Sequence, residues 1–129
     1  MFQFRLDGSS GVPPYLQLVH QVRQSLLLGY LQEGDRLPTV KDVAAGLVIN
    51  PNTVVKAYRQ LEHEGLASGR PGQGTFITAA SSPVPSQAQQ DLRASLEEWL
   101  RAAEQAGMSD DAVTALIAAA RHDMRKERV

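Results

Sequence analysis

The chain has no cysteine among its 129 residues, which excludes disulfide bonds and thiolate metal sites. It also lacks a run of about 20 apolar residues, and nothing at its start resembles a signal peptide. We therefore expect a soluble, cytoplasmic protein. The three histidines, His20, His63 and His122, are isolated in sequence and show no ligand spacing, so we expect no metal site, no cofactor and no enzymatic activity.

The chain also lacks the basic excess that nucleic-acid-binding domains usually show, since its formal net charge is −1. The charge is unevenly distributed. Residues 1–80 carry seven basic and six acidic side chains, a balance of +1, whereas residues 81–129 have a balance of −2. A balance of +1 offers few phosphate contacts, so tight binding to nucleic acid would need two copies acting together.

Residues 50–65, NPNTVVKAYRQLEHEG, predict one well-bounded helix. Asn50 can serve as N-cap, Pro51 as the first helical residue and Gly65 as the left-handed stop. Apolar residues recur at three- and four-residue steps and predict one buried stripe. This stripe consists of Val54, Ala57, Tyr58 and Leu61.

The other side of this helix is polar. Asn52, Lys56, Arg59 and His63 fall outside the apolar stripe. At the N-terminal end, side-chain amides, the Thr53 hydroxyl and unpaired backbone N–H groups are expected where the helix dipole is positive. This chemistry suits a helix that enters the DNA major groove.

Two helices are expected before this one. Pro13 and Pro14 open a core helix of about 15 residues, and Thr39 begins a second helix, with Asp42 completing a capping-box-like pair. Only a short connection separates the second helix from residues 50–65, so the two form a helix-turn-helix. Residues 1–11 look like an arm to which the sequence assigns no role.

After Gly65 the pattern changes to two brief strands, residues 66–68 and 75–77, separated by GRPGQG. Glycines let this tip bend sharply, and Arg70 and Gln73 are the side chains there able to reach a partner. Helix, helix-turn-helix and hairpin wing in this order predict a winged-helix domain of residues 12–78. The expected fold class is mainly α with a small β wing.

The last third of the chain is expected to mediate dimerisation. Residues 79–86, AASSPVPS, have the composition of a linker, and residues 87–129 predict two helices of about 20 residues. Each helix has one apolar face, and two such helices cannot form a full core alone. We therefore expect a four-helix arrangement across a homodimer. The side chains expected at its interface are Leu92, Leu96, Trp99, Val113, Leu116, Ile117 and Met124.

The motifs GDRLPTVKDVA, NPNTVVKAYRQLEHEGL and GQGTFI occur in an order and spacing that resembles the DNA-binding domain of the GntR family of bacterial transcription regulators. The two-helix tail, with GMSDDAV after its first helix, resembles the YtrA branch, whose members lack the large effector domain of other branches and dimerise through this tail. The resemblance implies a repressor that binds an inverted-repeat operator in double-stranded DNA as a homodimer.

The resemblance also implies which residues meet DNA. The family's early basic residue in the second helix falls on Lys41, usually an arginine, and its wing contact falls on residues 72–74. Lysine lacks the bidentate fork that arginine offers to guanine, so we do not expect the usual guanine contacts to transfer intact. The full set of expected DNA-binding residues is Thr39, Lys41, Asn50, Pro51, Asn52, Thr53, Lys56, Arg59, Arg70, Gly72, Gln73 and Gly74.

The polar residues of this helix allow two interpretations. Asn50 and Thr53 by themselves could merely cap a helix. Together with the tight turn, the exposed Lys56 and Arg59, and the wing, they favour DNA contact. The alternative function is a winged-helix module that binds protein or RNA without operator specificity.

Overall fold

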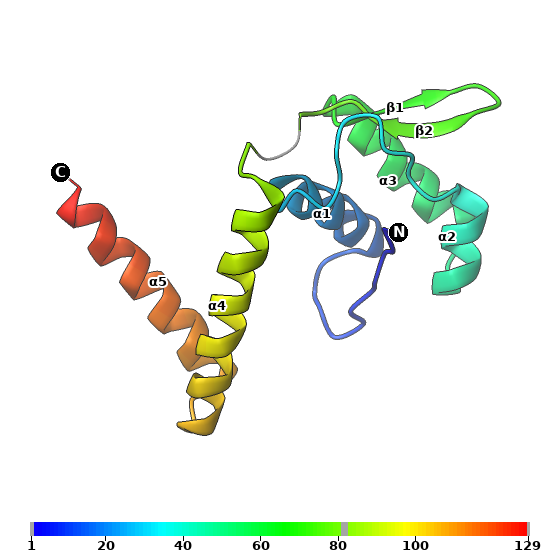
Figure 1. Ribbon diagram of the computed structural model, residues 1–129. Helices are drawn as coiled ribbons and strands as arrows, with labels where there is room; N and C mark the ends of the chain where they lie inside the picture. The colour runs from blue at the N-terminus through cyan, green and yellow to red at the C-terminus, as the bar shows by residue number, and fades with distance from the viewer. Residues whose placement is uncertain (1, 81–82, 129) are drawn as a thin grey trace. The chain divides into compact units, whose positions relative to one another are not determined.

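Figure 1 shows the computed structural model, which describes residues 2–80 and 83–128. Over these residues the elements follow in the order α1, α2, α3, β1, β2, α4, α5. The predicted fold class, mainly α with a small β wing and a helical tail, is confirmed. The chain separates into two compact units, Met1–Val84 and Pro85–Val129, and each is described by itself.

The first unit contains three short helices: α1 (Pro14–Leu27), α2 (Val40–Leu47) and α3 (Pro51–His63). Thr39 caps α2, because its Oγ1 accepts a hydrogen bond from the Asp42 backbone N–H at 3.1 Å. Gly65, with φ 76°, follows the last turn of α3 and ends the helix in the left-handed conformation. Local sequence signals therefore set where the helices begin and end.

The core of the first unit lies between α1, α3 and the sheet. All four residues of the apolar stripe predicted for α3 are buried, so the stripe is confirmed: Val54, Ala57, Tyr58 and Leu61. Each large side chain buried in this way contributes about 1.5 to 3 kcal/mol. The largest fully buried side chains are Leu18, Leu37, Leu61, Ile77, Val19, Val22 and Val54.

The N-terminal arm is part of this core. Phe4 is buried, and its ring meets that of Phe2 edge to face with the centroids 4.8 Å apart. Two glutamines on successive turns of α1 hold the main chain of the arm. The Gln21 side chain accepts a hydrogen bond from the N–H of Arg5 and donates one to its carbonyl. Gln17 makes the same two hydrogen bonds with Asp7. The arm thus obtains from side chains the backbone hydrogen bonds that a lone extended segment lacks.

The wing consists of β1 (Ala67–Arg70) and β2 (Gly74–Ile77), paired antiparallel (Figure 1). Its loop is shorter than the sequence indicated, because Gly69, Arg70 and Gly74 belong to the strands. Pro71 and Gly72 form the centre of a tight turn, closed by a hydrogen bond of 2.9 Å from Gln73 N to Arg70 O. Because the turn is tight, the pairing between the two strands extends to Arg70 and Gly74.

The second unit contains α4 (Ser86–Gln105) and α5 (Asp110–Glu127). Gly107, with φ 89°, lies in the connection, and Ser109 caps α5 by accepting a hydrogen bond of 3.1 Å from Ala112 N. Ala103 is the one buried side chain among the described residues of this unit. Of the expected linker, residues 79–86, Ser81 and Ser82 lie outside the described residues.

Neither a membrane-crossing helix nor a metal-binding cluster is present among the residues that the structure describes. None of the helices there is both long and apolar enough to span a bilayer. No group of three or more histidine or acidic side chains lies close enough together to hold an ion.

Candidate nucleic-acid interface

The turn between α2 and α3 sets the direction of α3. Val48 occupies a left-handed conformation with φ 55° and ψ 54°, and Ile49 N bonds back to Ala44 O at 3.1 Å. A β-branched residue rarely adopts a positive φ, because its Cβ crowds the following carbonyl. The chain therefore accepts local strain in order to join two helices through three residues.

Tyr58 holds α3 against the start of α2. Its hydroxyl donates a hydrogen bond to the carbonyl of Pro38, the residue before the cap of α2. Burial raises the pKa of Tyr58 well above its usual range, so the phenol stays protonated and able to donate. Packing and this hydrogen bond thus fix the inward face of α3, and the opposite face of the helix is directed outward.

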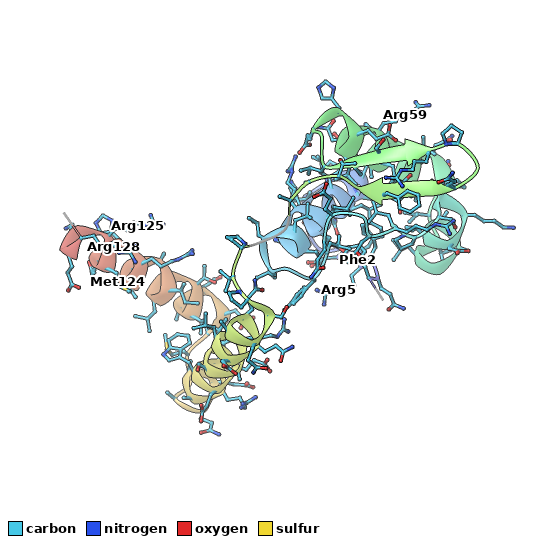
Figure 2. All side chains as sticks on the ribbon, turned by 45° about the horizontal axis from the view of Figure 1, so that its top comes forward. Phe2, Arg5, Arg59, Met124, Arg125 and Arg128 are labelled. Atoms are coloured by element: carbon cyan, nitrogen blue, oxygen red, sulfur yellow. The ribbon has the colours of Figure 1, made fainter. Side chains whose placement is uncertain are left out.

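The exposed face of α3 carries polar side chains on successive turns. Asn52, Lys56, Arg59 and His63 line one shallow hollow of about 610 Å³ together with Val55 and Gln60. Arg59 lies at the outer surface of the first unit (Figure 2). The structure therefore brings together four of the residues that the helical periodicity placed outside the apolar stripe.

The N-terminal end of α3 differs from expectation in one respect. The predicted unpaired backbone N–H groups are absent at residues 51–53. Pro51 has no N–H, Asn52 N donates to Asn50 Oδ1 at 2.9 Å, and Thr53 N donates to Asn50 O at 3.0 Å. Any contact with a ligand at this end must therefore come from side chains, such as the Asn50 Nδ2 amide, which the capping bond does not use.

The remaining expected residues of the helix-turn-helix lie at its surface. Lys41 and Thr39 are exposed at the start of α2, and Pro51 is exposed at the start of α3, while Thr53 is half-buried. Lys56 Nζ lies 4.0 Å from the centre of the Tyr15 ring, a cation–π contact that bends it towards α1. A phosphate contact by Lys56 would compete with this interaction.

Around the wing, Arg70, Gly72 and Gln73 are exposed. The Arg70 guanidinium Cζ lies 4.4 Å from the centre of the Phe76 ring, which orders the side chain near the tip. Gly72 and Gly74 have φ of 73° and 121°, so both need glycine. The wing therefore presents one ordered cation beside a narrow turn.

The apolar stripe of the tail is uncovered in the single chain. Val113 and Ile117 are half-buried, whereas the other large side chains expected at the interface are between 38% and 66% exposed. Met124 projects from α5 in Figure 2. The exposed members are Leu92, Leu96, Trp99, Leu116 and Met124.

A polar helix held outward by a helix-turn-helix, with a hairpin wing beside it, defines a winged-helix DNA-binding protein. Residues 14–77 match the family described as bacterial regulatory proteins, gntR family. The chain belongs to this GntR family and is a DNA-binding transcription regulator, which is a non-enzymatic role.

Two relatives from Bacillus subtilis indicate where the chain falls in the family. It is 40% identical over 74 residues to the HTH-type transcriptional repressor YtrA, a match covering 57% of each protein. It is 32% identical over 102 residues to the HTH-type transcriptional regulator YhcF, covering 79% of this chain and 84% of YhcF. The chain thus matches just over half the length of YtrA.

Among solved structures, the chain resembles YtrA from Sulfolobus acidocaldarius, a GntR-family transcription factor. The TM-score is 0.55 and the identity 26%, over 76% of this chain and 97% of that one. The resemblance to the YtrA branch that the sequence indicated is confirmed.

Proposed function

We propose that this regulator is a repressor that binds an inverted-repeat operator as a homodimer, with α3 in the major groove and the wing at the minor groove or the phosphate backbone. One observation carries the proposal. The side of α3 opposite the core presents Asn52, Lys56 and Arg59 on consecutive turns, at the surface and around one hollow. An amide and two long cations in this arrangement can reach base edges and phosphates together.

The direct contacts follow from the exposure of each residue. Asn50 and Asn52 have amides suited to adenine, Arg59 has the fork that suits guanine or phosphate, and Lys41 suits phosphate. Thr39 has a hydroxyl hydrogen free to donate, because its capping bond uses only the oxygen. Arg70 with Gly72, Gln73 and Gly74 would meet the adjacent minor groove or backbone.

The tail supports the dimer. Its uncovered apolar side chains would bury against a second copy, because a stripe of this size is costly to leave in water. Two-fold symmetry would then place two copies of α3 over two half-sites. In this proposal residues 12–78 bind DNA, residues 79–86 link, and residues 87–129 dimerise. A chromosomal regulator of this kind works in the cytoplasm.

The relatives favour DNA over the alternative of a protein- or RNA-binding winged helix. YtrA of Bacillus subtilis is described as a transcriptional repressor, and this chain is 40% identical to it over 74 residues. The polar face of α3 also suits the major groove of B-DNA, whereas double-stranded RNA has a deep, narrow major groove that side chains cannot read.

DNase footprinting on the region upstream of the chain's own gene tests this function. We expect a protected inverted repeat that a hundredfold excess of unrelated RNA does not displace. Asn52→Ala should weaken protection at the same protein concentration, because it removes one base contact per half-site. The matched control is Gln24→Ala, which changes an exposed amide on α1 away from α3. Protection that RNA abolishes would favour the alternative function.

A further inference from the structure

Arg36 lies beside the wing, although it precedes the wing by about thirty residues in sequence. It forms an antiparallel bridge with Phe76 of β2, flanked by hydrogen bonds of 2.8 Å from Leu37 N to Thr75 O and from Ile77 N to Asp35 O. The segment between α1 and α2 thus pairs with β2 through this one bridge and runs beside the two-stranded wing (Figure 1). Sequence reasoning did not include Arg36 in the site.

The register places Arg36 on the outer face of this sheet. Residues directly opposite in an antiparallel pair point to the same face, and faces alternate along a strand. Leu37, Ala67 and Ile77 are buried and point to the core. Arg36, Phe76 and Arg70 therefore share the opposite, outward face, since Arg36 and Ser68 both pair with Phe76 and Arg70 pairs with Gly74.

The guanidinium of Arg36 reaches along this face towards the wing tip. A Cβ atom at Gly74 would lie 2.8 Å from Arg36 Nε, closer than real Cβ atoms come to a neighbour, and 3.3 Å from Nη2. Gly74 therefore leaves room for the arginine as well as adopting φ 121°. On the same face, Arg70 lies over Phe76 at 4.4 Å, so two guanidinium groups occupy the outer face next to the turn.

Neither cation is neutralised within the described part of the chain. The two ion pairs found there join Arg23 to Glu64 and Arg93 to Glu97, and neither involves Arg36 or Arg70. Asp35, the carboxylate next in sequence to Arg36, accepts a hydrogen bond of 2.9 Å from Gln32 N. Two unpaired guanidinium groups on one surface are suited to bind phosphate, which their planar forks fit.

We propose that Arg36 binds a DNA phosphate next to the wing, so that the wing grips the backbone with two arginines from separate segments of the chain. The proposal rests on the DNA-binding function above and adds a contact to it. A phosphate contact carries no base information, so Arg36 should contribute equally to operator and unrelated DNA. It also supplies charge to a domain whose overall balance is low.

The test measures affinity for a labelled operator duplex and for a scrambled duplex of the same length, at several salt concentrations. Arg36→Gln should weaken binding to both by the same factor, roughly tenfold at physiological salt. The slope of log K against log salt should fall by about 1.8 per dimer, since each lost phosphate contact in B-DNA contributes about 0.9. Arg36→Lys should keep the slope, because it keeps the charge.

The matched control is Arg101→Gln, which removes one exposed arginine from α4 and should leave the slope unchanged. An equal loss of affinity in Arg36→Gln and Arg36→Lys with an unchanged slope would overturn the proposal, because Arg36 would then only support the wing. A loss confined to the operator would also overturn it. A wild-type chain that binds neither duplex would overturn the proposed function, and this contact with it.

Discussion

The hydroxyl of Tyr58, in the middle of α3, lies 2.5 Å from the carbonyl oxygen of Pro38, just before α2. This bond joins the proposed recognition helix to the residue before the cap of α2. The ring itself is buried and lies 6.3 Å from that of Phe4, so the N-terminal arm packs on the same anchor. The position of α3 thus depends on contacts from two other segments, the residues before α2 and the N-terminal arm.

Tyr58→Phe tests this anchor, because it removes the hydroxyl and keeps the ring. We expect a loss of about 1 kcal/mol in the free energy of unfolding, the usual net contribution of one hydrogen bond with a partner left unsatisfied. Urea denaturation followed by circular dichroism measures it. Identical midpoints for the variant and the wild type would show that the bond does not stabilise the first unit.

Val48→Gly should stabilise the protein. A left-handed conformation costs an L-residue about 1 to 2 kcal/mol, and glycine removes this cost. Part of the gain is lost because glycine has more conformational freedom in the unfolded chain. Val48 is 88% exposed and loses almost no packing. We expect a net gain of about 0.5 to 1 kcal/mol in denaturant titrations. Val48→Ala is the control, since alanine retains the strained φ, and an equal gain in both variants would contradict the argument.

Glu64 should make stability fall at acid pH. Hydrogen bonds from Arg23, and then from Gln60, hold the pKa of the Glu64 carboxyl below its ordinary value. Because the folded pKa is the lower one, this stabilisation is complete above about pH 4.3, the unfolded value, and is lost as pH falls through the folded pKa. The pair is partly exposed, so its contribution stays under about 1 kcal/mol.

The measurement for this pair is thermal unfolding of wild type and Glu64→Gln between pH 7 and pH 3. The gap between their melting temperatures should narrow below about pH 4.3. Asp91→Asn, an exposed carboxylate in α4, provides a comparison outside the first unit. A gap that stays constant over this range would mean that Glu64 is not stabilised as a carboxylate.

Leu116→Asp should convert a dimer into a monomer with a folded winged helix. The change places an unpaired charge in the proposed seam between two tails. Light scattering at micromolar concentration measures the mass of the particle and should give that of a monomer. Specific operator binding should disappear at ordinary salt, because each half-site contact is weak alone. Ala115→Asp, on the opposite side of α5 by helical periodicity, should leave both properties intact. A wild-type monomer that binds a full operator tightly would contradict the dimer.

The sequence predicted the features that depend on neighbouring residues. Asn50, Pro51 and Gly65 bound α3 as expected, and its buried stripe follows from helical spacing. Contacts between distant segments were missed. The bridge between Arg36 and Phe76 depends on the path of a loop, which periodicity does not reveal.

The arm shows the same limit. The sequence assigned no role to residues 1–11, and the partners of their main chain are glutamines on α1. Glutamine side chains on a helix surface give no sequence signal of what they bind. The prediction of unpaired N–H groups at the start of α3 was wrong for a different reason. Asn50 accepts hydrogen bonds from the N–H groups of Asn52 and Thr53, and Pro51 has no N–H.

Selection of binding sites from a pool of random DNA duplexes tests the central claim most directly. The full chain at physiological salt should enrich an inverted repeat whose half-site centres lie about one helical turn, roughly 10 base pairs, apart. Asn52→Ala should lose preference at particular positions of each half-site, while keeping the spacing. Enrichment of a single unpaired half-site, or of no sequence at all, would contradict a dimer that reads DNA through α3.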